Sequence, residues 1–558
     1  MKLHAILSGI ILSAILLVAA CRSSSTPEAP PPESQAIPAT STSTPEPEAA
    51  SANIIKATTP EKSAGQPGSQ LSDTPASVVA THDLPRSSLF EIDWDDRSVF
   101  KAGLIESEQA ILDDLPGASI YHLEIEVSDD LHLISGREAV RYTNMEGGSL
   151  NEVYFHLYPN LLGGFETISD VTINGQAVEP GYELNNSAMK VPLPQPLQPG
   201  EQVVISMDFT SSVPQSQERN YGIFASVDGI LALAHFYPLI AVYEEGGWDI
   251  ETPSPNGDVV YADTAFYIVQ VVAPPEQTVI ASGVTIDQTR SGEAQTVTFA
   301  GGPMRDFYVV SSGRYEAVSR SVGDTMINSY FLPGQRDAGE LALQYAAGSL
   351  ESFNDRYGVY PFTEFDVAPT ANQALGIEYP GIVAINLLLY DLDGRLGDIP
   401  TSVFFESTVA HEVGHQWFYS LVGNDQLEEP WVDEALTQYA TWRYYLDMYG
   451  QGGADGFREA LVSRLERLER REERSIPIGK AVDEYDLPQY SAIVYGRGPL
   501  FFEALAEEIG QETVDEFLRD YALTYRWGIA KSEDLQRLAE AHCVCDLSRL
   551  FDEWVYGE

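Results

Sequence analysis

The spacing of the hydrophobic residues changes once along this chain, and that change limits the folds that the chain can adopt. From about residue 89 to about residue 322, apolar and polar residues alternate in short segments that are separated by turn residues. Such alternation is typical of antiparallel sheets. In the segment "YHLEIEVSDD", one face is formed by Tyr121, Leu123, Ile125 and Val127. We therefore predict an antiparallel β domain, a sandwich or saddle, over residues 86–325.

From about residue 329 the apolar residues recur with helical spacing. The segment "TSVFFESTVAHEVGHQWFYSLVG" is expected to form one helix that ends at Gly423, and "WVDEALTQYATWRYYLDMYG" a second that ends at Gly450. In "FREALVSRLERLERREER" one stripe is apolar, and we expect the charged residues around it to face solvent. These patterns predict a mainly helical domain over residues 326–558, so the predicted fold class is α+β.

The N-terminus, "MKLHAILSGIILSAILLVAAC", joins a short basic start to an apolar run that ends at a cysteine. It resembles a bacterial lipoprotein signal, which implies removal of residues 1–20 and lipidation of Cys21. The alternative is an uncleaved helical anchor, which we disfavour because the run is short for a membrane span. Residues 21–85 are rich in Ser, Thr, Pro and Ala and are expected to form a disordered tether. Either interpretation predicts an extracytoplasmic protein that is attached to the membrane.

The charge of the chain argues against nucleic acid as a partner. The formal net charge is −51, and no basic patch stands out in the sequence. The remaining cysteines, Cys543 and Cys545, are too few for a disulfide framework. We expect them to lie in a turn or to form a local disulfide.

A short motif within the helical half indicates metal chemistry. In "VAHEVGHQWF", His411 and His415 are four residues apart and therefore lie on the same face of a helix, where both can bind one ion. Glu412 lies at the edge of the same face. A catalytic zinc site needs a third protein ligand and an open position for water. The two histidines are therefore suggestive rather than decisive.

The third ligand is sought downstream of the motif. In one large class of zinc enzymes, glycine and histidine follow at positions that Phe418 and Leu421 occupy here, so that class is excluded. Glu434 follows His415 after 18 intervening residues, in the first turn of the next predicted helix. Taken alone, Glu434 is an acid that suits a helix N-terminus. Combined with the histidines and the preceding tryptophan, it is the predicted third metal ligand.

The two segments "HEVGHQWF" and "PWVDEAL" resemble the aminopeptidase N family of zinc peptidases, a branch of the thermolysin-like gluzincins. The resemblance implies a thermolysin-like catalytic domain over residues 326–558 and one Zn²⁺ as cofactor. It implies that His411, His415 and Glu434 bind this ion and that Glu412 is the general base. Asp433 and Glu406 are candidates for orienting these groups.

Two further segments extend the resemblance. "LGIEYPG" stands where the family has Gly-x-Met-Glu-Asn, which implies that Gly376 and Glu378 bind the substrate and that Glu378 binds its free amino terminus. Ile377 and Tyr379 depart from that motif. The alternative for Glu378 is a surface carboxylate in a turn. "IVYGRG" implies that Tyr495 stabilises the tetrahedral intermediate, and the alternative is a core tyrosine with a satisfied hydroxyl.

The resemblance covers the chain from about Ser119 to the C-terminus, including "HFYPLIAVYEEGGWD" and "FNDRYGVYPFTEFDV". Larger family members add further modules that cap the cleft, so we expect a more open site here. His156 and His235 lie in strand-like surroundings and are expected to be structural.

The predicted function is that of a zinc aminopeptidase at the cell surface, acting on peptides with a free N-terminus. One alternative is a less strict zinc peptidase that also cuts internally. Another is a non-catalytic binding module on the same fold, which the presence of Glu412 disfavours.

Overall fold

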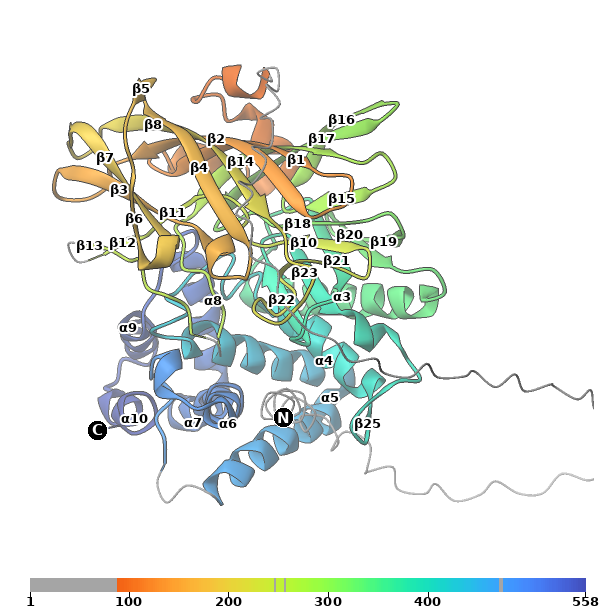
Figure 1. Ribbon diagram of the computed structural model, residues 1–558. Helices are drawn as coiled ribbons and strands as arrows, with labels where there is room; N and C mark the ends of the chain where they lie inside the picture. The colour runs from red at the N-terminus through yellow and green to blue at the C-terminus, as the bar shows by residue number, and fades with distance from the viewer. Residues whose placement is uncertain (1–87, 245–246, 255–256, 471–474, 558) are drawn as a thin grey trace, which may run out of the picture. The chain divides into compact units, whose positions relative to one another are not determined.

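The computed structural model describes residues 88–244, 247–254, 257–470 and 475–557 (Figure 1). The predicted signal peptide, the lipidation site Cys21, the tether at 21–85 and the first two residues of the predicted β domain, 86–87, lie outside these residues.

An eight-stranded sheet dominates the first half of the described chain (Figure 1). Its order is β16-β17-β14-β1-β2-β8-β4-β5. The strands are β1 (Ser119–Val127), β2 (Leu133–Thr143), β4 (Phe165–Ile173), β5 (Gln176–Ala177), β8 (Gln202–Ser212), β14 (Ala265–Ala273), β16 (Val284–Ser291) and β17 (Ala294–Met304). Leu123 and Ile125 of β1 are fully buried, as their alternation predicts.

One strand pair corrects the expectation of a purely antiparallel sheet. Strands β1 and β14 run parallel, with Ser119 opposite Ala265, whereas the other pairs of this sheet are antiparallel. Neighbouring strands joined by a hairpin must be antiparallel, but β1 and β14 are far apart in sequence and the long connection permits either direction. Sequence alternation alone does not reveal which distant strands pair.

Smaller sheets complete this half. One has the order β15-β18-β10-β9, another β11-β3-β7-β6, and a third is the pair β12-β13. Their strands are β3 (Leu150–His156), β6 (Gly181–Glu183), β7 (Ala188–Leu197), β9 (Phe224–Val227), β10 (Ile230–Leu233), β11 (Leu239–Ile240), β12 (Tyr243–Glu244), β13 (Gly247–Trp248), β15 (Thr278–Ala281) and β18 (Val309–Ser312).

The second half begins with a five-stranded sheet of order β19-β20-β21-β23-β22. The strands are β19 (Glu316–Val322), β20 (Thr325–Phe331), β21 (Glu364–Thr370), β22 (Gly376–Tyr379) and β23 (Ile382–Asn386). The hairpin β19–β20 spans the predicted domain boundary at residues 325/326. Helix α3 (Arg336–Tyr357) packs against β19 and β20, and α4 (Thr401–Gly414) packs against β22 and β23 (Figure 1).

Helices form the rest of the chain. They are α5 (Trp431–Glu469), α6 (Leu487–Ala492), α7 (Gly498–Ile509), α8 (Gln511–Thr524), α9 (Ser532–Cys543) and α10 (Ser548–Phe551). A shorter helix, α2 (Ile111–Asp114), precedes β1, and a short pair of strands, β24 (Arg395–Leu396) and β25 (Ile399–Pro400), precedes α4. The backbone breaks at Gly450, where φ is 65° and ψ is −164°, and helical structure then resumes. Among the described helices, none is both long and apolar enough to cross a bilayer. Cys543 and Cys545 form a local disulfide.

The helix that carries the histidine motif ends earlier than predicted. Helix α4 stops at Gly414 with His415 as its C-cap, not at Gly423. The backbone then forms a tight turn in which Ser420 N donates to the His415 carbonyl at 2.9 Å. Tyr419 takes a φ of 139°, which no helix allows.

Arg305 holds this turn from the β-rich half. It follows β17 and is buried. Its Nε donates to the carbonyl oxygen of Tyr419 at 2.8 Å and its Nη1 to that of Ala262 at 3.2 Å, and its Nη2 donates to that of Gly528. A residue before the second half thus fixes the backbone that follows His415.

Candidate active site

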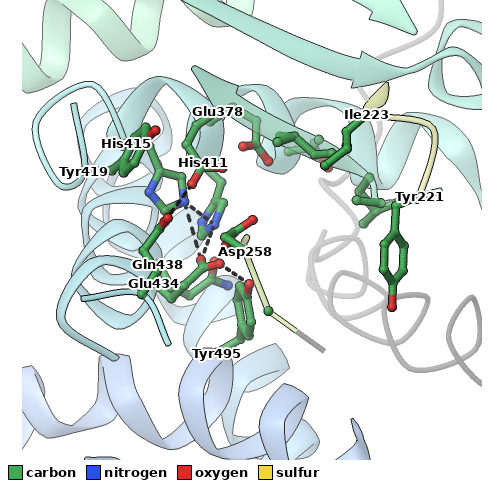
Figure 2. Close-up of a pocket in the computed structure, with 18 of the residues that line it drawn as sticks. Tyr221, Ile223, Asp258, Glu378, His411, His415, Tyr419, Glu434, Gln438 and Tyr495 are labelled. Carbon is green, nitrogen blue, oxygen red and sulfur yellow. Dashed lines mark hydrogen bonds and ion pairs between the residues drawn. The ribbon is translucent and has the colours of Figure 1, made fainter. Parts of the chain in front are cut away.

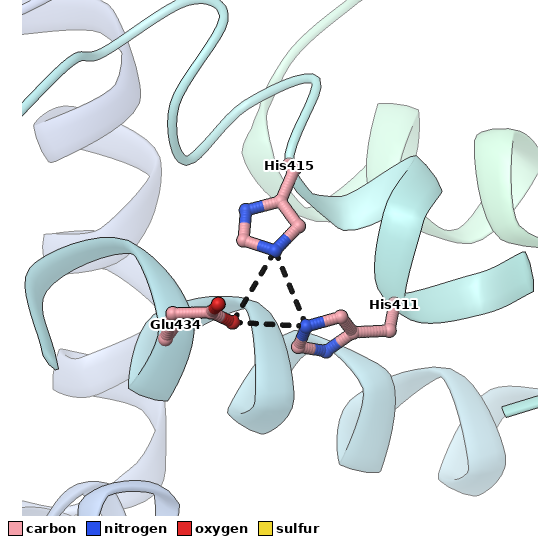
Figure 3. Close-up of side chains that lie close together, drawn as sticks. All are labelled: His411, His415 and Glu434. Atoms are coloured by element: carbon pink, nitrogen blue, oxygen red, sulfur yellow. Dashed lines mark hydrogen bonds and ion pairs between the residues drawn. The ribbon is translucent and has the colours of Figure 1, made fainter. Parts of the chain in front are cut away.

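Two histidines and a glutamate converge between α4 and α5 (Figure 3). His411 lies in the last turn of α4, His415 caps that helix, and Glu434 lies in the first turn of α5. The Nε2 atom of His411 is 3.1 Å from Oε2 of Glu434 and 3.2 Å from Nε2 of His415. The His415 Nε2 atom is 3.4 Å from the same carboxylate oxygen.

These distances fit one zinc ion. Ligand atoms bound to zinc at about 2.0–2.1 Å in tetrahedral directions are separated by about 3.3 Å. The three measured separations lie within a few tenths of an ångström of that value. Two imidazole nitrogens and a carboxylate oxygen are also ligands that zinc prefers. The donor set therefore matches the predicted cofactor.

The second nitrogen of His415 is fixed by its surroundings. Its Nδ1 lies 2.9 Å from the carbonyl oxygen of Phe418 and 3.2 Å from Oγ1 of Thr437, which directs Nε2 toward the convergence point. The candidates Asp433 and Glu406 do not act on the histidines in this way. Asp433 accepts hydrogen bonds from Gln426 and from the Glu434 backbone.

Glu406 lies elsewhere: its Oε1 accepts hydrogen bonds from two tyrosine hydroxyls, those of Tyr444 and Tyr449. Burial would raise the pKa of Glu434, but its hydrogen bonds with His411 and His415 hold that pKa well below the usual range.

Tyr495 lies beside the predicted metal ligands (Figure 2). It belongs to a π-helical segment, η8 (Ile493–Arg497), a distortion that is frequent at functional sites. Its hydroxyl donates a hydrogen bond to Oε1 of Glu434, the carboxylate oxygen that does not face the histidines. Tyr495 is therefore at the site, in contact with a predicted ligand, and not elsewhere in the core.

Glu412 is buried next to Gly376 of β22. Burial raises the pKa of Glu412 well above its usual range, and the nearby carboxylate of Glu378 raises it further. A carboxylate with a raised pKa holds a proton more readily, as a general base must after it has accepted one. The strand β22 thus forms the wall against which this group packs.

Glu378 is buried in β22 and not exposed in a turn. Its strand pairs antiparallel with β23, and its Oε1 accepts a hydrogen bond from Nε2 of Gln426 at 3.3 Å. Burial raises the pKa of Glu378 well above its usual range. One cavity is lined by Glu378, His411, His415 and Glu434 (Figure 2). Glu412 also lines this cavity, whose volume is about 300 Å³.

Comparison with known proteins shows which family has a similar domain. Residues 341–554 match the model of the peptidase family M1 domain. This chain carries a peptidase family M1 domain. The predicted resemblance to the aminopeptidase N family is confirmed for that part of the chain. The matched residues, 341–554, include His411, His415 and Glu434.

Curated relatives match at low identity. Aminopeptidase 2 of Candida albicans is 24% identical over 274 residues, which cover 47% of this chain and 29% of the relative. Aminopeptidase M1 of Arabidopsis thaliana is 25% identical over 305 residues, which cover 52% of this chain and 34% of the relative. The chain thus spans about a third of the length of these relatives.

Solved structures confirm the fold. The M1 zinc metallopeptidase of Deinococcus radiodurans superposes with a TM-score of 0.58 at 20% identity, covering 78% of this chain and 93% of that one. A mutant of that enzyme bound to a Tyr-Ser-Ala substrate superposes equally well, at 20% identity and over the same shares of both chains. The predicted order, a β-rich half followed by a helical half, is therefore the arrangement of M1 peptidases.

The cavity also contains groups that precede the M1 domain in sequence. Asp258, which follows β13 in the chain, lines the cavity near Glu434 and Tyr495 (Figure 2). Burial raises its pKa well above the usual range, and the carboxylates of Glu434 and Asp433 raise it further. Sequence analysis missed Asp258 because no local pattern marks it.

Two predictions about individual side chains have different outcomes. His156 and His235 are both buried, as expected of structural histidines, and His235 Nδ1 lies 3.3 Å from Oδ2 of buried Asp306. His235 nevertheless also lines the cavity. The prediction that the charged residues of the segment 457–474 face solvent is wrong for Arg464, which is buried and lines the cavity of the M1 domain.

Proposed function

We propose that this chain is a zinc-dependent metallopeptidase, and specifically an aminopeptidase that hydrolyses the N-terminal peptide bond of peptides. The observation that carries the proposal is that the ligand atoms of His411, His415 and Glu434 converge in the cavity that Glu412 and Glu378 also line. The M1 domain match and the peptide-bound structural neighbour support it.

Bound zinc would polarise the scissile carbonyl and lower the pKa of a coordinated water. The carboxylate of Glu412 accepts the proton of the attacking water and passes it to the leaving nitrogen. The raised pKa of Glu412 suits this step, because the group must hold the proton between the two transfers.

Tyr495 and Glu378 act on the substrate. The Tyr495 hydroxyl, which donates to Glu434 in this structure, donates instead to the carbonyl oxygen as negative charge develops there. The carboxylate of Glu378 binds the ammonium group of the substrate. Because that anchor lies in the same cavity as the metal ligands, it restricts cleavage to the first peptide bond.

The test is a panel of peptides with free and with acetylated amino termini, together with internally quenched peptides, assayed with and without a zinc chelator. We expect cleavage of the free-amine substrates alone, loss with the chelator, and recovery when zinc is added back. Equal cleavage of acetylated peptides would favour the less strict peptidase. An absence of cleavage by protein that contains zinc would favour the binding module.

We also propose that the protein is a lipoprotein, attached to the membrane through Cys21 and held outside the cytoplasm by the tether at 21–85. The sequence alone supports this proposal. Replacement of Cys21 by Ser should abolish incorporation of labelled fatty acid and move the protein from the membrane fraction to the soluble one. Unchanged membrane association would favour the uncleaved anchor.

A further inference from the structure

Arg464 is a buried cation in the cavity, and none of the described residues gives it a carboxylate partner. It lies in α5, is 7% exposed and lines the cavity that holds the metal ligands. Its guanidinium carbon lies 5.6 Å from the centroid of the Tyr495 ring, over the ring face. One nitrogen, Nη2, donates to Oγ of Ser491. Throughout the described residues, neither Nε nor Nη1 has a hydrogen-bond partner.

Other arginines of the described chain find partners in more than one way. Acidic residues outnumber basic ones by 83 to 32, so a carboxylate partner is easily found. Arg356 pairs with Asp447, and Arg141 pairs with Asp95. Buried Arg305 donates to three backbone carbonyls. In the described part of the chain, no acidic residue lies within ion-pair distance of Arg464.

An unpaired buried guanidinium is costly unless a partner arrives. Burial lowers the pKa of Arg464 to about 10, which leaves the group charged at neutral pH. Two acids of the cavity have other partners: Glu434 faces the histidines and Tyr495, and Glu378 accepts from Gln426. Two buried donors of Arg464, Nε and Nη1, therefore still lack a partner among the described residues, and a ligand could supply one.

The charges of the cavity indicate what kind of ligand this is. Glu378 and Asp258 provide carboxyl groups that can pair with a cation, whereas Arg464 provides a positive charge. A short peptide with an ammonium group at one end and a carboxylate further along complements both. The cavity volume of about 300 Å³ suits a ligand of that size.

We propose that Arg464 binds a carboxylate of the substrate and gives the enzyme a preference for short peptides that carry one. The carboxylate is the C-terminal group of a di- or tripeptide or an acidic side chain. This inference rests on the proposed peptidase function and names the substrate class of the same site. Guanidinium is suited to the task because its planar N–H groups match the two oxygens of a carboxylate.

The experiment compares matched peptides. The first pair is Ala-Ala-Ala as the free acid and as the C-terminal amide. The second pair is Ala-Asp-Ala amide and Ala-Asn-Ala amide. We expect the wild-type enzyme to prefer the carboxylate in one of these pairs by about tenfold in kcat/KM, as a charge-assisted hydrogen bond would give. The pair that shows the preference identifies the source of the carboxylate.

Variants connect the preference to Arg464. Arg464→Met should bring the ratio of kcat/KM for the two peptides of that pair close to one. Arg464→Lys should retain part of the preference. The ratio is informative even if loss of the contact with Tyr495 lowers kcat for all peptides. The control is Arg458→Met on the same helix, because Arg458 is exposed and pairs with Glu503. Its ratio should equal that of the wild type.

The outcome separates this inference from the proposed function. Equal kcat/KM for both members of both pairs, or a preference that Arg464→Met retains, overturns the role of Arg464 while peptidase activity stands. A protein that cleaves none of the peptides overturns the proposed function. Calorimetric binding of the preferred peptide and its neutral partner to Glu412→Gln, with and without Arg464→Met, then tests the carboxylate contact without turnover.

Discussion

Gly376 lies against the carboxylate of Glu412 so closely that a Cβ atom at position 376 would clash with Oε1 of Glu412. The backbone of β22 thus sets the position of the predicted general base. Gly376→Ala should displace this carboxylate and lower kcat by tenfold or more, with zinc content unchanged. The control is Gly452→Ala in α5, where nothing lies within 4 Å of the new Cβ. A Gly376→Ala enzyme of normal kcat would show that this contact is not required.

Glu412→Gln keeps the shape of the side chain but removes its ability to accept a proton. We expect turnover to fall below detection while about one zinc per chain stays bound, since Glu412 is absent from the converging ligand set. Metal analysis and peptide hydrolysis on the same preparation measure both quantities. Residual activity near that of the wild type would refute the assignment of Glu412 as the base.

Tyr495→Phe removes the hydroxyl that donates to Glu434 in this structure. If this hydroxyl stabilises the developing oxyanion, kcat should fall about 100-fold or more while KM changes little. Steady-state kinetics on a free-amine peptide separate the two parameters. An effect that is confined to KM would show that Tyr495 contributes to substrate binding alone.

Glu378→Ala removes the predicted anchor for the substrate ammonium. We expect kcat/KM for free-amine peptides to fall by about 100-fold, because a charged hydrogen bond in a buried site is lost. Acetylated peptides, which have no ammonium group, should be affected far less. Equal losses on both kinds of peptide would contradict the anchoring role and support a less strict peptidase.

Glu166 links stability to pH at a distance from the cavity. Burial raises its pKa to about 8, although Ser211 donates to its Oε1 at 2.9 Å. Between about pH 4.5 and 8 the folded state keeps this proton and the unfolded state has released it. The free energy of unfolding should therefore fall as pH rises through this window, by up to about 1.4 kcal/mol per pH unit from this group.

Glu166→Gln should remove the contribution of Glu166 to the pH dependence of the free energy of unfolding. The amide mimics the protonated acid and still accepts a hydrogen bond from Ser211. Denaturant unfolding at pH 5 and pH 8 measures the difference, with Glu179→Gln at an exposed position as the control. A slope that Glu166→Gln leaves unchanged would mean that Glu166 does not retain its proton on folding.

The convergence of the three predicted metal ligands could be inferred from the sequence because their signal is local. His411 and His415 share a helix face through their spacing, and Glu434 follows in the first turn of the next helix. The helix that carries the two histidines ends earlier than its apolar pattern predicts. The turn after His415 depends on a hydrogen bond from Arg305, which is more than 100 residues upstream. Sequence periodicity does not contain such contacts.

The burial of Arg464 is a second feature that the local sequence pattern did not predict. It is three residues after Leu461 and four before Leu468, so it lies on the apolar stripe of α5, and both leucines are buried. This spacing was a usable signal, but the neighbouring charges pointed to a solvent-facing surface. No sequence pattern marks Asp258 as a cavity residue, since it reaches the cavity only when the β-rich half folds against the helices.

The bonds that Arg305 makes to the carbonyl oxygens of Tyr419 and Gly528 give the β-rich half a part in metal binding. An excised fragment that begins at residue 341 would contain both histidines and Glu434 but would leave those two carbonyls without their donor. We therefore expect the segment 341–554 to be incomplete as a metal site on its own. Its zinc affinity should depend on the β-rich half as well.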